Sequence, residues 1–235
     1  MAYTLVLPFH GILDSILESA RTAREEGSVE GIREVLLAHN GAVLSPEMQA
    51  EVDAVCAPAD ASHPAVRFVH TDRKGLGAGY RLGIEEAREE FVILSADDLP
   101  FGWTDVREFE HAGRPDFAIG SKAHRRSKVQ GVTFTRKLST FGFKTLRRVV
   151  LGWNTPGDSQ GSLIVRTSIA QAFLPELHYD NYLSSLELAT LHLRAGGKIV
   201  EVPIQNKPPQ PTSVSLFKDS MLMARGLFEL RTRRR

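Results

Sequence analysis

Mainly apolar runs of four or five residues recur along the first half of the chain, and most of them are followed by a segment with helical spacing. The runs predict strands at residues 3–7, 34–38, 66–69, 91–94 and 117–120. The segments between them predict helices at residues 14–25, 50–55 and 78–90. This alternation is typical of an α/β fold, a mainly parallel sheet with helices on both of its faces.

The domain organisation predicted from the same pattern is simple, because the chain contains no internal repeat and no low-complexity linker. We predict one α/β domain over residues 1–212. An amphipathic helix and a basic tail at residues 213–235 would belong to the same domain. Two roles stay open for the helix, whose periodicity covers residues 214–228: it packs back on the domain, or it lies at a membrane surface.

The most informative segment surrounds the fourth predicted strand. Lys74-Gly75-Leu76-Gly77-Ala78 opens the helix before it, and Asp97 and Asp98 follow the strand directly. Ligands of open α/β sheets bind at the carboxyl ends of strands. Paired carboxylates there suit a hard divalent cation, Mg²⁺ or Mn²⁺, which would in turn hold a diphosphate. Alone, the glycine segment could be only a tight turn, and the Asp pair could be only a helix cap. The order and spacing of the two motifs favour a ligand site.

These glycines do not form a dinucleotide-binding fingerprint. That motif follows the first strand of its fold and needs an acidic residue about twenty positions further on. Here the first strand ends in Pro8-Phe9-His10-Gly11, and the glycines follow the third strand. The sequence therefore argues against an NAD- or FAD-dependent oxidoreductase.

Composition indicates the cellular compartment and the kinds of partner to expect. The chain has 235 residues, 42% of them hydrophobic, with a formal net charge of +1 and one cysteine, Cys56. An internal disulfide is thus excluded, which fits a reducing compartment. The chain shows no secretory signal and no apolar stretch of membrane-spanning length. We predict a cytoplasmic protein with no nucleic-acid partner. Peripheral contact with a membrane and a homodimer are left open.

Basic residues gather in the middle of the chain. Residues 117–157 contain no Asp or Glu but nine basic residues, namely Lys122, Arg125, Arg126, Lys128, Arg136, Lys137, Lys144, Arg147 and Arg148. Such a segment beside a metal site favours an anionic ligand, either a phosphate or a lipid surface. A solvated cationic face is the alternative.

Several motifs, in their order along the chain, resemble family 2 glycosyltransferases of the GT-A fold, and among these the polyprenyl-phosphate sugar transferases such as the dolichol-phosphate mannosyltransferases. The resemblance extends over about residues 3–228 and includes the glycine turn and Asp97-Asp98-Leu99. Its later motifs are Gly120-Ser121-Lys122, Arg136-Lys137-Leu138-Ser139-Thr140, Asp158-Ser159-Gln160-Gly161-Ser162 and Val202-Pro203-Ile204 with Glu187 before it.

The resemblance implies roles for residues on the donor side. Residues 8–11, with Pro8 and His10, and the turn at His39 and Asn40 would lie under the base and ribose of a UDP or GDP sugar. Lys74 and Gly75 would lie near the base and the diphosphate. Asp98 would be the principal ligand of Mg²⁺ or Mn²⁺, with help from Asp97, because Ala96 stands where the family pattern has its first Asp.

On the acceptor side, the resemblance assigns Lys122, Arg136 and Thr140 to a lipid phosphate. It assigns Asp158 and Glu187 to the catalytic region, with Glu187 orienting the acceptor or acting as a base. Glu187 lies in a predicted helix at residues 182–193, on the same face as Leu183 and Leu191. Because a carboxylate on an inward face is costly unless paired or functional, a structural ion pair with an arginine is the alternative.

The function predicted in this way is inverting, metal-dependent transfer of a sugar from a nucleotide-diphosphate sugar to a polyprenyl-phosphate or similar anionic acceptor. One alternative keeps the enzyme and moves the sugar to a hydroxyl of a small molecule or glycan, with a base at or near Glu187. Another is a sugar-nucleotide-binding protein of weak activity, suggested by Ala96 and by Asn40 in place of an Asp.

Overall fold

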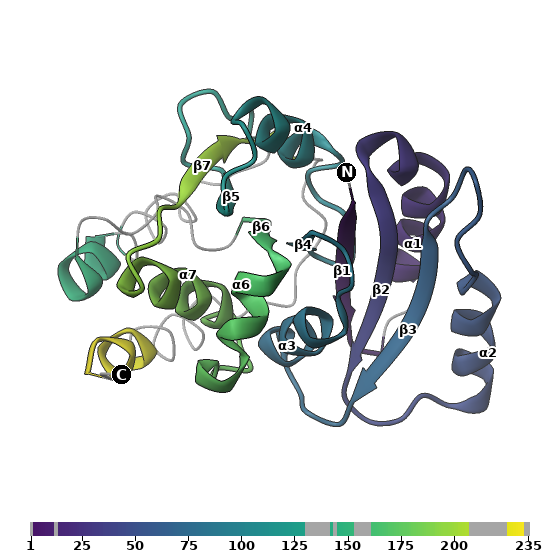
Figure 1. Cartoon of the computed structure of the whole chain (residues 1–235). Helices are drawn as coiled ribbons and strands as arrows, with labels where there is room; N and C mark the ends of the chain where they lie inside the picture. Colours follow the sequence, from purple (N-terminus) through teal and green to yellow (C-terminus); the bar gives the residue numbers. More distant parts are fainter. Residues whose placement is uncertain are drawn as a thin grey trace.

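The structure is a computed structural model, and it describes residues 2–11, 14–129, 142, 145–152, 161–206 and 225–232. Within these ranges, seven strands form one sheet in the order β3-β2-β1-β4-β6-β5-β7 (Figure 1). The strands are β1 (Tyr3–Phe9), β2 (Ile32–Asn40), β3 (Ala65–Thr71), β4 (Phe91–Leu94), β5 (Phe117–Ser121), β6 (Leu163–Arg166) and β7 (Val200–Pro203). All run parallel except β6, which is antiparallel to both β4 and β5. The predicted α/β class with a mainly parallel sheet is confirmed.

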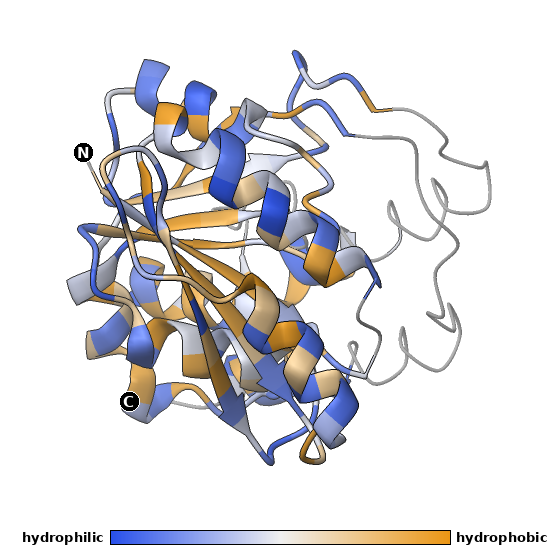
Figure 2. Cartoon of the chain, turned by 90° about the vertical axis from the view of Figure 1, so that its right-hand side faces the viewer, coloured by the Kyte–Doolittle hydropathy of each residue, from blue (hydrophilic) through white to orange (hydrophobic). Residues whose placement is uncertain are grey.

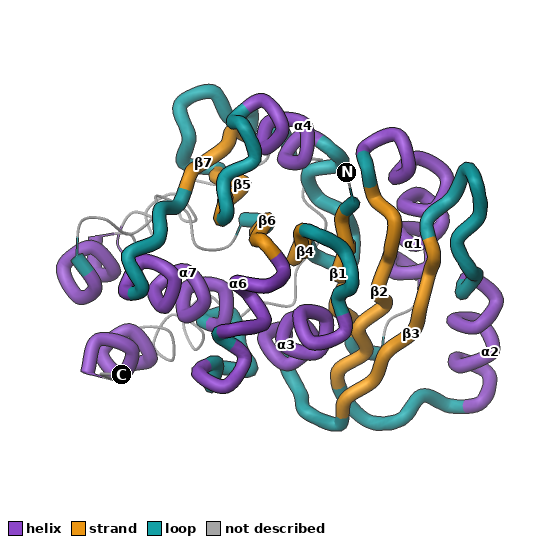
Figure 3. Tube along the Cα trace, in the orientation of Figure 1, coloured by secondary structure: helices purple, strands orange, loops and turns teal. Residues whose placement is uncertain are grey.

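The helices cover both faces of this sheet (Figures 1 and 3). Helices α1 (Asp14–Glu26), α2 (Pro46–Val55) and α4 (Thr104–His111) contribute to one core layer. Helices α3 (Leu76–Glu86), α6 (Thr167–Ala172) and α7 (Ser184–Arg194) contribute to the other. Two short 3₁₀ helices, η1 (Gly27–Glu30) and η2 (Leu174–Glu176), and helical segments at residues 145–151 and 225–232 make up the other helical structure of these ranges.

Strand β1 shows how the sequence produces two core layers. Its odd-numbered residues, Tyr3, Leu5, Leu7 and Phe9, pack in the layer of α1, whereas Val6 packs in the layer of α3. Successive side chains of a strand point to opposite faces, so a continuous apolar run buries both faces of a central strand. Figure 2 shows the hydrophobic strands between the more polar outer surfaces of the helices.

The described end of the chain packs against the domain. Residues 225–232 form a helix whose Leu227 and Leu230 are buried with Leu183, Leu186 and Val150. This contact agrees with the first of the two roles considered for the C-terminal helix, although residues 214–224 lie outside the described ranges. No helix within those ranges combines the length and the hydropathy that a membrane span requires.

Several boundaries differ from the sequence predictions for local reasons. Strand β1 continues through Pro8, which pairs with Ala38 of β2. Its nitrogen faces the side of β4, where the ladder with β1 has already ended at Val6, so the missing N–H costs no ladder bond. Helix α3 ends at Glu86 rather than at residue 90, because the amides of Arg88 and Glu89 donate to the Thr4 hydroxyl instead.

Candidate functional site

One edge of the sheet collects the predicted donor residues. The parallel strands β1, β2, β3, β4 and β5 all end there, so a set of predicted residues lies at or just after strand ends along a single edge, namely His10, Asn40, Lys74, Asp97 and Lys122. Between β1 and β4 the order of the strands changes direction. The connection from β1 to β2 passes through α1 on one face of the sheet, and the connection from β3 to β4 passes through α3 on the other face. Such a switch point opens a crevice in which α/β proteins bind ligands.

The glycine turn is shaped by close backbone contacts on both sides. Gly75 has φ = +112°, a conformation that L side chains rarely adopt, and a Cβ there would lie 2.1 Å from the carbonyl oxygen of Asp180. A Cβ at Gly79 would lie 2.7 Å from the Cβ of Pro8, so α3 packs directly on β1 at that point. Pro8 is thus buried beneath the helix, where it supports the edge of the site.

Asn40 ties the end of β2 to this turn. Its side chain is 3% exposed, and its Nδ2 donates to the carbonyl oxygen of Gly75. Because only the amide nitrogen can donate, this bond fixes the orientation of the side chain. The Oδ1 atom is then buried without a hydrogen-bond partner in the described structure. An unpaired buried acceptor is costly, so this oxygen is well suited to a donor group of a ligand.

Three histidines stand side by side at the ends of β1, β2 and β3. The ring of His39 stacks on that of His70 with centroids 5.1 Å apart, and their Nδ1 atoms are 2.9 Å apart. The His10 ring lies 6.4 Å from that of His39, and its Nδ1 donates to the carbonyl oxygen of Asn40 at 2.7 Å. Burial, together with His70 and His10, lowers the pKa of His39 from 6.5 to about 4. His39 is therefore neutral at physiological pH.

The lowered pKa of His39 predicts a loss of stability in mild acid. Between pH 6.5 and about 4 the unfolded chain binds a proton at His39 that the folded chain does not, so the free energy of unfolding falls as the pH falls. The loss attributable to His39 is at most about 3 kcal/mol. Denaturant titrations across this range should show a shallower pH dependence for His39→Gln, and an unchanged one for His111→Gln at an exposed histidine. Equal slopes in wild type and His39→Gln would contradict the assignment.

The carboxylate pair lies on a turn directly after β4. Asp97 and Asp98 are both partly exposed, and the Ser15 hydroxyl in the first turn of α1 donates to Asp97 Oδ2 at 2.9 Å. The next residue, Leu99, is buried and has φ = +44°, a left-handed backbone that is rare for leucine. Strain of this kind persists where the surrounding structure enforces it, and it is concentrated at functional sites.

The side chains of this turn are chemically suited to bind a divalent ion. Two carboxylates supply the hard oxygen ligands that Mg²⁺ and Mn²⁺ prefer. The described ranges contain no group of three or more His, Cys, Asp or Glu side chains able to hold a metal ion. Oxygens of the donor diphosphate and water would have to complete the coordination, which is common for Mg²⁺.

Of the predicted acceptor residues, only Lys122 and Glu187 fall within the described ranges. Lys122 is exposed just after β5, and its ammonium nitrogen lies 5.5 Å from the centre of the Phe101 ring. Arg136, Thr140 and Asp158 lie outside the described residues. Asp158 precedes β6, whose antiparallel direction places its first residue, Leu163, at the same edge of the sheet.

Glu187 is buried in α7 and bound to backbone. Its side chain is 2% exposed, and its Oε2 accepts the amides of His178 at 2.9 Å and of Tyr179 at 3.0 Å. The Oε1 atom lies 3.5 Å from His178 Nδ1. The predicted cost of an inward carboxylate is therefore offset by hydrogen bonds from the loop before α7.

Three residues of this region were not anticipated from the sequence. The contact of Ser15 with Asp97 depends on the packing of α1, and the position of His70 beside His39 depends on the register of β2 and β3. Asp180 forms a two-pronged ion pair with Arg73, at 2.8–3.2 Å, across more than a hundred residues of sequence. No local pattern indicates a pair at that separation.

Comparison with known proteins gives relatives for both the sequence and the fold. No protein-family model matches the chain. A dolichyl-phosphate beta-glucosyltransferase from Saccharomyces cerevisiae is 26% identical in an alignment of 178 positions that covers 68% of this chain and 53% of the yeast protein. The chain thus spans about half the length of that curated relative.

Solved structures extend the comparison to nearly the whole chain. Glucosyl-3-phosphoglycerate synthase from Mycobacterium tuberculosis, in complex with Mn²⁺, UDP-glucose and phosphoglyceric acid, superposes with a TM-score of 0.65 at 14% identity, covering 98% of this chain and 78% of that one. Mannosyl-3-phosphoglycerate synthase from Rubrobacter xylanophilus superposes with a TM-score of 0.67 at 12% identity, covering 98% and 72%. The chain has the GT-A fold. With the yeast relative, these findings confirm the resemblance to family 2 glycosyltransferases.

Proposed function

We propose that this GT-A chain transfers a sugar from a nucleotide-diphosphate donor with the help of Mg²⁺ or Mn²⁺. The observation that carries the proposal is the position of Asp97 and Asp98, on a strained turn at the switch point of the sheet and along the same edge as the glycine turn. The Mycobacterium tuberculosis neighbour was crystallised with Mn²⁺ and a UDP sugar, which supports the choice of ion and of donor class.

A bound ion would neutralise the negative charge that develops on the leaving diphosphate. The residues of the chain supply the rest of the site. Asp98 and Asp97 would hold the ion, and the Ser15 hydroxyl keeps the Asp97 carboxylate in place. The family resemblance implies inversion at the anomeric carbon, and this stays a prediction.

Asn40 would contact the base of the donor. With Nδ2 committed to Gly75, only its Oδ1 acceptor remains for the ligand. Uracil at N3 and guanine at N1 present an N–H that such an acceptor can receive, as do the exocyclic amino groups of cytosine and adenine. The choice of a UDP or GDP sugar therefore rests on the family resemblance and on the UDP sugar of the solved neighbour. The neutral His39, one residue earlier on β2, is 1% exposed and packs with Phe9 and Phe68 on the face opposite to Asn40.

The role of Asn40 predicts a loss of donor affinity in Asn40→Ala. Removal of one hydrogen bond between buried groups should raise the dissociation constant of the preferred nucleotide diphosphate about tenfold. Calorimetry on wild type, on Asn40→Ala and on Gln49→Ala, a control at a half-buried position of α2, would measure this. Identical affinity in wild type and Asn40→Ala would place the base elsewhere in the crevice.

A screen of thermal stability tests the proposed donor class directly. We expect UDP, GDP, CDP and ADP, each with and without Mn²⁺, to raise the unfolding temperature by different amounts. At equal concentration, a ligand that binds the folded chain more tightly stabilises it more. We expect stabilisation by UDP or GDP that depends on Mn²⁺. Stabilisation by none of the four would contradict the proposed function.

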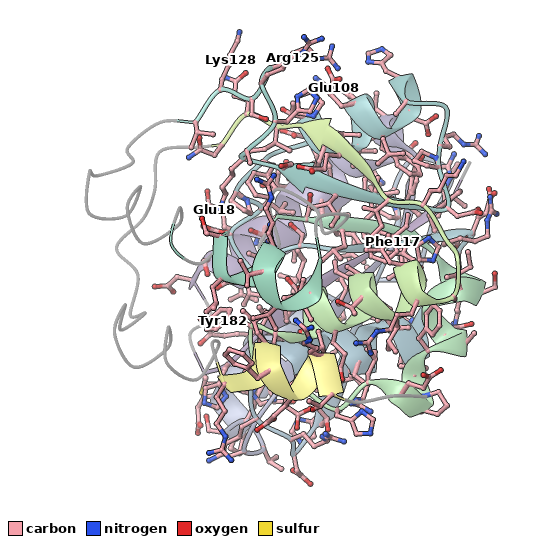
Figure 4. All side chains as sticks on the ribbon, turned by 90° about the vertical axis from the view of Figure 1, so that its left-hand side faces the viewer. Glu18, Glu108, Phe117, Arg125, Lys128 and Tyr182 are labelled. Atoms are coloured by element: carbon pink, nitrogen blue, oxygen red, sulfur yellow. The ribbon has the colours of Figure 1, made fainter. Side chains whose placement is uncertain are left out.

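For the acceptor we propose a molecule that carries a phosphate, with a polyprenyl phosphate as the first choice. The yeast relative is named for a dolichyl phosphate, and the solved neighbours are named for phosphoglycerate, so a phosphate is common to both. Lys122 begins an exposed basic loop after β5 that also carries Arg125 and Lys128, which Figure 4 shows at one outer end of the molecule near Glu108. Cations at this edge would hold an anionic acceptor.

A further inference from the structure

The loop before α7 touches the donor turn at several points. The carbonyl oxygen of Asp180 accepts the amide of Gly77 at 2.8 Å, and Cβ atoms at Gly75 and Gly77 would collide with the carbonyls of Asp180 and Tyr179. The Asp180 carboxylate also binds Arg73, the residue just before Lys74. The turn at residues 73–77 is therefore held from the side of α7 as well as from the side of β2, where Asn40 binds Gly75.

Glu187 in turn holds this loop. Its Oε2 accepts two consecutive amides, those of His178 and Tyr179, directly before Asp180. An acceptor in the rigid first turns of α7 thereby fixes residues 178–180, and these fix the glycine turn. A path of contacts runs from Glu187 through Asp180 to Gly77 and Gly75.

We propose that Glu187 is a positioning residue for the donor site, acting through Asp180 on the turn that carries Lys74 and Gly75. The inference rests on the proposed function and assigns Glu187 to the donor rather than to the acceptor. Oε2 accepts two loop amides, and this use of the side chain needs an acceptor oxygen but no titratable group. What the site requires of residue 187 is an acceptor for two amides.

The two roles predict different results for binding of the nucleotide diphosphate in the absence of any acceptor. Glu187→Ala removes the acceptor of two part-buried amide bonds and frees the loop that holds the turn, so the dissociation constant for UDP or GDP with Mn²⁺ should rise about tenfold. Glu187→Gln keeps a carbonyl oxygen at that position and should change this constant by less than about threefold. Its kcat should fall by a similarly small factor. Glu51→Ala, on the exposed face of α2, is the control.

A general base would give the opposite pattern. Glu187→Gln would then lose turnover by several powers of ten while both substitutions left acceptor-free donor binding unchanged, and that result would overturn the proposal. Arg73→Ala provides a second variant that does not disturb the core, because the Arg73 side chain is half exposed. It should weaken donor binding by about threefold, in keeping with a partly solvated pair, and leave the KM for the acceptor unchanged.

Hydrogen exchange separates failure of this inference from failure of the proposed function. In Glu187→Ala, but not in Glu187→Gln, the amide of Gly77 should exchange faster than in wild type, since its acceptor belongs to the released loop. This measurement needs no ligand. Unchanged exchange at Gly77 in Glu187→Ala would overturn the positioning role. Faster exchange in a chain that binds no nucleotide would instead overturn the proposed function.

Discussion

Asp98→Asn is expected to remove most of the Mn²⁺-dependent donor binding and activity. Asparagine has almost the same shape as aspartate but lacks its charge, and a charge-assisted contact contributes about 1.5–3 kcal/mol, or roughly ten- to a hundredfold in affinity. Asp98 follows β4 at the switch point, with the strained Leu99 directly after it. Calorimetric titration of the nucleotide diphosphate, with Mn²⁺ and with a chelator, measures the effect.

Asp97→Asn should have a smaller effect, because Asp97 shares its carboxylate with the Ser15 hydroxyl and the amide oxygen can still accept that bond. Asp53→Asn, on the exposed face of α2, controls for a general effect of charge. If turnover of Asp98→Asn equals that of wild type, the metal role of Asp98 is wrong. If only Asp97→Asn loses Mn²⁺-dependent donor binding, Asp97 rather than Asp98 is the principal metal ligand.

The sequence predicted those parts of the site that depend on local pattern. Strand β4 was predicted at its observed bounds, because Phe91–Leu94 is an apolar run between polar segments. The Asp pair follows it after two small residues. The glycines at 75 and 77 marked a turn where no Cβ fits. Once several strands are parallel, their ends must share an edge, so the placement of Asn40 and Asp97 there followed from the fold class.

Other features depend on contacts that no local pattern encodes. Strand β6 is only four residues long and joins the sheet in the antiparallel direction, which the alternation of strands and helices does not predict. Helix α4 was missed, and it begins without a side-chain cap at Trp103. The bonds from the Glu187 carboxylate to the loop at residues 178–179 arise from packing, since periodicity could show only that Glu187 faces inward. Its partners therefore emerged only from the structure.

Arg136→Ala is expected to separate the two acceptor classes. The residue lies in the acid-free stretch at 117–157, and the family resemblance places it on the acceptor phosphate. Loss of one charge-assisted contact, about 1.5–3 kcal/mol, should weaken acceptor binding by one to two powers of ten and leave donor binding intact. Arg33→Ala, at the exposed start of β2 on the opposite edge of the sheet, is the matched control.

The comparison requires both acceptor types, a polyprenyl phosphate and an uncharged hydroxyl compound, with Arg136→Ala and Glu187→Gln measured on each. A phosphate acceptor is already an anion and needs little help from a base, so cations dominate its binding and Glu187→Gln should remain active. A hydroxyl acceptor must lose a proton, so Arg136→Ala should matter little there. In that case Glu187→Gln should abolish turnover and erase the acidic limb of the pH–rate profile.

We expect the phosphate pattern, because the exposed basic loop after β5 and the names of the related proteins both point to a charged acceptor. If Arg136→Ala leaves acceptor binding unchanged while Glu187→Gln loses turnover, the acceptor is a hydroxyl compound. The same result would contradict the positioning role of Glu187.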